Sequence, residues 1–174
     1  MNPYRDQGQA GFILRFALSM AVLTVVYSHL EPLFGYTYLY PLSLSVAALL
    51  DLVGVPTVLA LYLDQGFCEL QMERNVFLVE YECAGVFPLC IYLGTVGVYS
   101  ATLAAKVRGV VLGIPAFFAY AVVRLLGLGL IGHLAPSWLE FFHVYLMVAL
   151  NLGFLFFLWF FWVNHWTIGM SKSA

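Results

Sequence analysis

Charged residues are scarce in this sequence. Of its 174 residues only 9% are Asp, Glu, Lys or Arg, whereas an ordinary soluble domain has about 25%. Because 63% of the residues are hydrophobic and the mean hydropathy is +0.94, the composition excludes a globule exposed to water on all sides. The 7 basic residues are scattered and are outnumbered by 9 acidic ones. The sequence therefore lacks the basic patch with which proteins bind nucleic acid.

Cysteines are also few, and they are not grouped. Cys68, Cys83 and Cys90 are odd in number, so a single chain cannot pair them all. No set of cysteines and histidines has the spacing of a metal site. We therefore predict neither a metal nor another cofactor.

Long apolar runs, in contrast, are abundant and predict an integral membrane protein. A helix needs about 20 apolar residues to cross the hydrocarbon core of a bilayer. Four segments are predicted to span it: 11–30, 83–105, 109–130 and 141–163. The first requires the side chain of Arg15 to reach the membrane surface. No cleavage site of small residues follows it, so we expect an uncleaved anchor.

Two further segments do not fit a membrane span. Residues 41–52 lie between Pro41 and the break at 54–56, and they favour a short re-entrant or interfacial helix. Residues 64–82 contain turn signals and alternating apolar residues, which favour a small strand pair outside the membrane. The predicted fold is all-α: one transmembrane domain over 1–174, a bundle of about four to six helices with a small extracytoplasmic strand pair.

The basic residues predict the orientation of the bundle. Lys106 and Arg108 lie between two predicted spans and Lys172 follows the last, whereas the loop 133–140 has no Lys or Arg. By the positive-inside rule, these basic ends are cytoplasmic. The polar segment 64–82 and the loop then face outward. The predicted location is the inner, or cytoplasmic, cell membrane, with several passes.

Three residues are candidates for chemistry. Ionisable groups inside a membrane are costly and are therefore functional candidates. Arg124 lies about 22 Å from the cytoplasmic end of its predicted helix, in the outer half of the membrane. Cys83 begins its predicted helix at the outer surface, and His143 lies in the first turn of a helix that enters from the same side. We predict that the three converge at one depth.

Such a convergence suits nucleophilic catalysis. A helix N-terminus and a nearby cation favour the reactive thiolate of Cys83. His143 would take the thiol proton and protonate a leaving amine, and Arg124 would stabilise the oxyanion of an acyl intermediate. Each residue also has a structural interpretation. Cys83 would then be a small packing residue, His143 an interfacial histidine, and Arg124 the partner of an acidic residue, namely Glu80, Glu82 or Glu140.

The order of these residues resembles a known family. Glu82-Cys83-Ala84-Gly85 is followed by Ile114-Pro115-Ala116, by Val122-Val123-Arg124, and by Trp138 to His143. This order is similar to that of the exosortase/archaeosortase family of membrane-embedded cysteine transpeptidases. Their active site combines a Cys in an E-x-C-[SAT]-G-like motif, an Arg in a later helix, and a His or Arg beyond it. Here Ala84 replaces the commoner Ser or Thr, and the Asn that many members place before the Arg is missing.

The resemblance covers residues 40–165 and implies a function. Cys83 would be the nucleophile, Arg124 the oxyanion or substrate-positioning group, and His143 the third catalytic residue. Family substrates are exported proteins whose C-terminal sorting tail has a recognition motif, a hydrophobic helix and a basic cluster. The implied partners are that tail, membrane lipids, and an acceptor linked to lipid or glycan, or water. The implied active site faces the extracytoplasmic side.

Two other functions are compatible with the same residues. A membrane thiol-disulfide oxidoreductase would use Cys68 and Cys83 as an exchanging pair. A non-enzymatic membrane subunit or chaperone would use Arg124 only to pair with a partner helix. The first requires Cys68, whereas the second tolerates replacement of Cys83.

Overall fold

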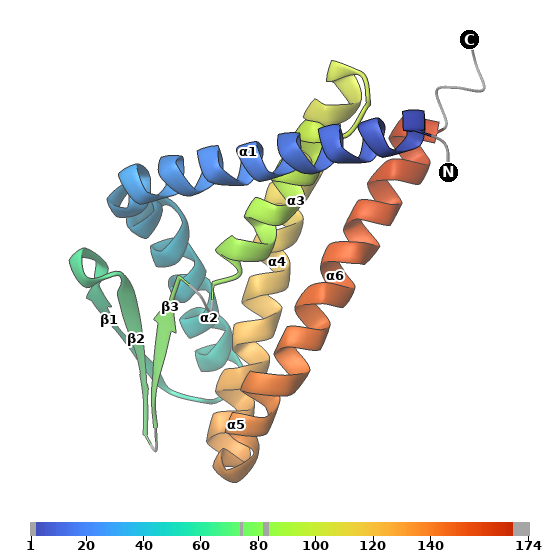
Figure 1. The fold of residues 1–174 in the computed structure, drawn as a ribbon. Helices are drawn as coiled ribbons and strands as arrows, with labels where there is room; N and C mark the ends of the chain where they lie inside the picture. The colour runs from blue at the N-terminus through green and yellow to red at the C-terminus, as the bar shows by residue number, and fades with distance from the viewer. Residues whose placement is uncertain (1–2, 74, 82–83, 169–174) are drawn as a thin grey trace.

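The described part of the chain is a helical bundle with one small sheet. The computed structural model describes residues 3–73, 75–81 and 84–168, and it is mostly helical (79%). The helices are α1 (Pro3–Phe34), α2 (Tyr40–Leu52), α3 (Val86–Val98), α4 (Leu103–Leu134), α5 (Leu139–Phe141) and α6 (Met147–Trp162). The strands are β1 (Thr57–Tyr62), β2 (Phe67–Met72) and β3 (Val76–Glu80) (Figure 1).

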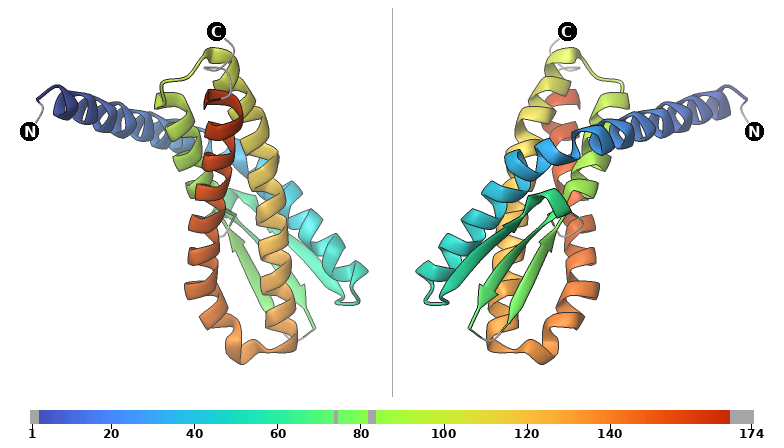
Figure 2. Two further views of the ribbon diagram at one scale, coloured as in Figure 1. Left: turned by 90° about the vertical axis from the view of Figure 1, so that its right-hand side faces the viewer. Right: turned by 90° about the vertical axis from the view of Figure 1, so that its left-hand side faces the viewer.

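Three helical stretches are long and apolar enough to cross a membrane. They are Gly11–Leu30, Leu103–Leu134 and Pro136–Trp166, and they contain or match the predicted spans 11–30, 109–130 and 141–163. These stretches indicate a membrane protein. In Figures 1 and 2, α4 and α6 run side by side in opposite directions, whereas α1 lies crosswise to them.

Within the predicted span 83–105 the structure contains only a short helix. α3 has 13 residues, which is about 20 Å and less than the thickness of the hydrocarbon core. It ends at Val98 because Tyr99 has an extended backbone, with ψ at 140°. The Thr102 hydroxyl then accepts the N–H of Ala105 at 3.3 Å and caps the start of α4. The predicted span therefore covers the whole of α3, the connection 99–102 and the first residues of α4.

The predicted strand pair is part of a three-stranded sheet. β2 and β3 lie within 64–82 and pair in antiparallel register, with Phe67 opposite Glu80. β1 was not predicted; it pairs antiparallel with β2, and the strand order is β1-β2-β3. Its sequence, TVLALY, is apolar without clear alternation, so it gives little strand signal. The predicted helix at 41–52 is present as α2, which continues α1 through a π-helical turn (Gly35–Leu39).

The sheet is fixed at one end of α4. Alternate residues of β2, among them Cys68 and Leu70, are fully buried in the same core cluster as α2. The Asn75 side chain donates a hydrogen bond to the Gly132 carbonyl at 2.6 Å, which ties the β2–β3 turn to the last turns of α4. The α3–α4 connection with Lys106 lies at the other end (Figure 1). The sheet and the 133–140 loop thus share one end, and the absolute sidedness stays a prediction of the positive-inside rule.

Two glycines of α4 leave room for large aromatic side chains from α3 and α6. Tyr92 of α3 packs on Gly113 and donates its hydroxyl to the Gly109 carbonyl at 3.1 Å. Trp162 of α6 packs on Gly109 and donates its indole N–H to the Ala105 carbonyl at 2.8 Å. Both aromatic side chains are fully buried. Small residues let membrane helices approach closely, and these two glycines bring α3 and α6 onto α4.

We predict that Gly113→Ala destabilises the fold. A Cβ at this position would overlap the Tyr92 ring, and overpacking of this kind costs about 1–3 kcal/mol. The matched control is Gly127→Ala on the same helix, where a Cβ would meet nothing within 4 Å. That control should be neutral or stabilising by up to about 1 kcal/mol, because alanine favours helix. Thermal unfolding in detergent measures both, and equal melting temperatures would contradict the packing assignment.

Candidate functional site

Arg124 lies on the inward face of α4. Its side chain is only 8% exposed, and the neighbouring residues Ala121, Leu125 and Leu128 are buried on the same side of the helix. Two of the acidic residues considered as its partners, Glu80 and Glu140, are exposed. A buried cation in a membrane-spanning helix is costly and marks this part of α4 as the first candidate site.

The segment next to Cys83 packs against the same part of α4. Cys83 and Glu82 lie outside the described residues, whereas Ala84 and Gly85 are described and buried. A Cβ on Gly85 would lie 4.0 Å from the Ala121 Cβ, one turn before Arg124. The Tyr38 hydroxyl donates a hydrogen bond to the Ala84 carbonyl at 3.1 Å. Ala84 and Gly85, which follow Cys83 in the sequence, therefore lie beside the turn of α4 that precedes Arg124.

This segment enters the bundle deeper than the sequence predicts. The sequence places the start of the helix after Cys83 at the outer surface. In the structure Gly85 lies beside Ala121, which is 13 residues, or about 20 Å, before the end of α4 at Leu134. α3 therefore begins opposite the middle of α4.

α6 presents one polar side chain to this site. Its inward residues recur at helical spacing: Met147, Asn151, Phe154, Leu158 and Trp162. Phe154 stacks on Tyr120 of α4, with ring centroids 4.3 Å apart and an interplanar angle of 7°. Asn151 lies one turn from Phe154 on the same side of α6, so it lies at the level of Tyr120 and Arg124.

Tyr120 and Asn151 are site residues that sequence reasoning missed. The Tyr120 hydroxyl and the Asn151 side-chain oxygen are buried and have no hydrogen-bond partner among the described residues. Tyr120 lies one turn before Arg124 on α4. The signal in the sequence is weak, because it consists of one Asn in an apolar run and one Tyr four residues before an Arg.

His143 lies farther toward the α5 end than Arg124 does. It is half-buried in a π-helical turn (Phe142–Leu146) that leads into α6. The contact of Phe154 with Tyr120 sets the register of the two antiparallel helices. In this register the backbone of His143 is about 10 Å nearer the α5 end than that of Arg124. The convergence of Cys83, Arg124 and His143 at one depth stays a prediction, because Cys83 lies outside the described residues.

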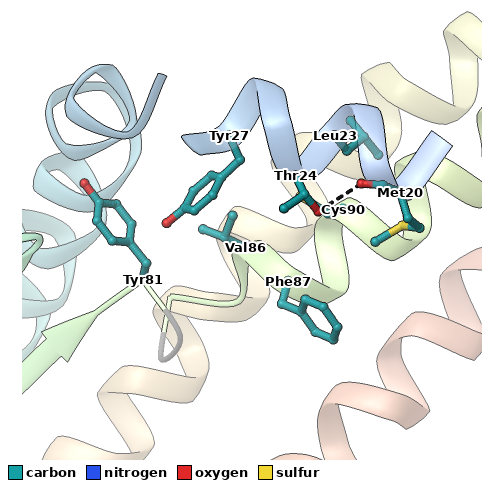
Figure 3. A pocket seen from close by; sticks show the side chains of 8 residues that line it. All are labelled: Met20, Leu23, Thr24, Tyr27, Tyr81, Val86, Phe87 and Cys90. Atoms are coloured by element: carbon teal, nitrogen blue, oxygen red, sulfur yellow. Dashed lines mark hydrogen bonds between the residues drawn. The ribbon is translucent and has the colours of Figure 1, made fainter. Parts of the chain in front are cut away.

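An apolar groove lies beside the N-terminal half of α3. It lies between α1 and α3, encloses about 280 Å³, and is lined by Met20, Tyr27, Tyr81, Val86, Phe87 and Cys90 among others (Figure 3). Tyr81 and Val86 belong to the chain on either side of residues 82–83, and Tyr27 packs edge-on against Tyr81 at 5.8 Å. The groove is thus bounded by residues of α1, of α3 and of the chain between β3 and α3.

The other two cysteines are free thiols in different surroundings. Cys68 of β2 is fully buried, and burial raises the pKa of its thiol. A buried thiol with a raised pKa is a poor partner for thiol–disulfide exchange. Cys90 is half-buried and lines the groove. Within the described ranges no three His, Cys, Asp or Glu side chains gather as metal ligands do.

Comparison with known proteins finds no relative: no protein-family model, curated protein or solved structure matches this chain.

We expect Tyr120→Phe to leave the free energy of unfolding unchanged or to raise it by about 1 kcal/mol. The lost hydroxyl is buried without a hydrogen-bond partner, and removing such a group does not cost a bond. The matched control is Tyr92→Phe, whose hydroxyl bonds the Gly109 carbonyl and whose loss should cost about 1–3 kcal/mol. Thermal unfolding in detergent compares them, and an equal loss in both variants would show that Tyr120 has a structural bond.

Proposed function

We propose that this chain is an exosortase-like cysteine transpeptidase or endopeptidase that cleaves the C-terminal sorting tail of exported proteins. The observation that carries the proposal is the packing of Ala84 and Gly85 against α4, one turn before the buried Arg124. Cys83 immediately precedes Ala84 in the sequence, and the proposal puts its thiol next to the guanidinium. The cation favours the thiolate form of a neighbouring cysteine and is suited to a developing oxyanion.

The proposed reaction proceeds through a thioester. The Cys83 thiolate attacks the scissile carbonyl carbon, and Arg124 stabilises the resulting oxyanion. When the intermediate collapses, the peptide C–N bond breaks and His143 protonates the leaving amine. The hydrophobic tail departs, and the upstream part stays on the sulfur as a thioester. Water or the amine of a lipid- or glycan-linked acceptor then attacks this thioester and releases the thiol.

The apolar groove between α1 and α3 supports this substrate class. Its wall is almost wholly apolar, and it includes Tyr81 and Val86, which come one residue before and three residues after 82–83 in the sequence. A hydrophobic tail helix in the membrane would lie along it and present its recognition motif to Cys83. The basic cluster that follows the helix would stay in the cytoplasm.

Tyr120 and Asn151 support the proposal as positioning residues. Their buried polar atoms have no partner among the described residues and lie at the level of Arg124. Unpaired polar groups in a membrane-spanning pair of helices lower stability and are retained at functional sites. We assign them to the orientation of the guanidinium and of the substrate peptide group.

Replacement of Cys83 tests the nucleophile. Cys83→Ala should abolish tail removal, because no other thiol takes the place of the attacking group, while the protein stays folded in the membrane. Mass spectrometry of the C-termini of exported proteins compares native and variant cells. The control is Cys68→Ala, which removes a buried thiol and should leave processing intact. Normal processing in Cys83→Ala would refute the proposal, and a requirement for Cys68 would favour the oxidoreductase.

Replacement of His143 tests the proton donor. His143→Ala should lower turnover about 10²–10⁴-fold, and raising the pH should not restore it, because the leaving amine still lacks an acid. The control is His133→Ala, a half-buried histidine in the last turn of α4, which should keep near-native turnover. Cleavage of a synthetic tail peptide between pH 6 and 9 gives both profiles. Full recovery at high pH would restrict His143 to deprotonating the thiol.

A further inference from the structure

A second groove lies between α1 and the end of α3, away from the sheet. It has a volume of about 550 Å³ and is wide open. The groove is lined by Leu18, Ser19, Val22 and Gly97 and by two cations, Arg15 of α1 and Lys106 of α4. The groove therefore combines an apolar floor with positive charge, unlike the almost wholly apolar groove of Figure 3.

The two cations are available to an anion. The residues that line the groove include no Asp or Glu. Arg15 is exposed although it lies within the apolar stretch Gly11–Leu30. Lys106 is half-buried and donates a hydrogen bond to the Gly97 carbonyl at 2.6 Å, and the described residues that line the groove beside it carry no negative charge. Cations in a membrane protein without an acidic partner favour a negatively charged neighbour.

The position of the groove indicates which anion it meets. Lys106 and Gly97 lie at the α3–α4 connection, the end of the bundle opposite the sheet (Figure 1). The positive-inside rule predicts that this end is at the cytoplasmic membrane surface, where anionic lipid headgroups lie. The positive charge disfavours the basic cluster of a sorting tail, although Leu23 lines both this groove and the apolar groove of Figure 3.

We propose that this groove binds one anionic phospholipid. Its phosphate lies between Arg15 and Lys106, the Ser19 hydroxyl contributes a hydrogen bond to the headgroup, and an acyl chain follows Leu18 and Val22. The site does not depend on the proposed peptidase activity, because it shares no residue with Cys83, Arg124 or His143. A bound lipid would join α1 to the start of α4 at this end.

The test is lipid binding to the purified full chain in a zwitterionic detergent. Native mass spectrometry titrates phosphatidylglycerol, with phosphatidylcholine as the uncharged counterpart and glycerol phosphate as the soluble headgroup. The native chain should prefer phosphatidylglycerol. Arg15→Gln should weaken this binding about fivefold, and the double variant Arg15→Gln, Lys106→Gln about 30-fold.

The matched control is Arg108→Gln. Arg108 is two residues from Lys106 on α4 but lines a different groove, with Pro115 and Trp166. Its replacement should leave phosphatidylglycerol binding within twofold of native, although it removes one positive charge, as Arg15→Gln does. The proposal is overturned if the double variant binds like the native chain, if Arg108→Gln weakens binding equally, or if phosphatidylcholine binds as tightly. Competition by glycerol phosphate at similar concentrations would also overturn it in favour of a soluble phosphate site.

Discussion

The contact of two aromatic side chains with the backbone of α4 holds this bundle together. Tyr92 and Trp162 lie over Gly113 and Gly109 and bond the carbonyls of Gly109 and Ala105. Apolar burial gives little preference for one helix over another inside a membrane, because lipid tails are as apolar as leucine. Close packing and interhelical hydrogen bonds then decide which helices associate. These two contacts fix α3 and α6 on α4, and they set the axial positions of the other residues of these two helices along α4.

The candidate site follows from this arrangement. Because α3 is short and is held near the start of α4, its first turn comes to lie beside Ala121 in the middle of α4. The register of α6 brings Asn151 to the same level and leaves His143 nearer the α5 end. At the other end of α4 the sheet is tied to Gly132. The α4 helix is therefore the common support of the sheet, the chain beside Cys83, and the polar residues around Arg124.

Several features could be predicted from the sequence because they depend on local composition. The long apolar helices, the helix at 41–52 and the pairing of β2 with β3 all follow from runs, breaks and turn residues. Arg124 could be recognised as a site residue because a lone cation in an apolar run has a known cost. β1 and the true length of α3 could not be predicted from the sequence. An apolar strand, and a break between two apolar helices, leave almost no local signal.

The sequence by itself determined that the chain belongs in a membrane and which polar residues would lie inside it, because transfer into hydrocarbon depends on each residue's own chemistry. Only the tertiary structure decided which of those residues meet. Tyr120 of α4 stacks on Phe154 of α6, and Asn151 lies one turn from Phe154 with its side-chain oxygen buried. The reason is that the rotation and axial register of neighbouring helices depend on side chains packed far away along the same helices, here at Gly109 and Gly113.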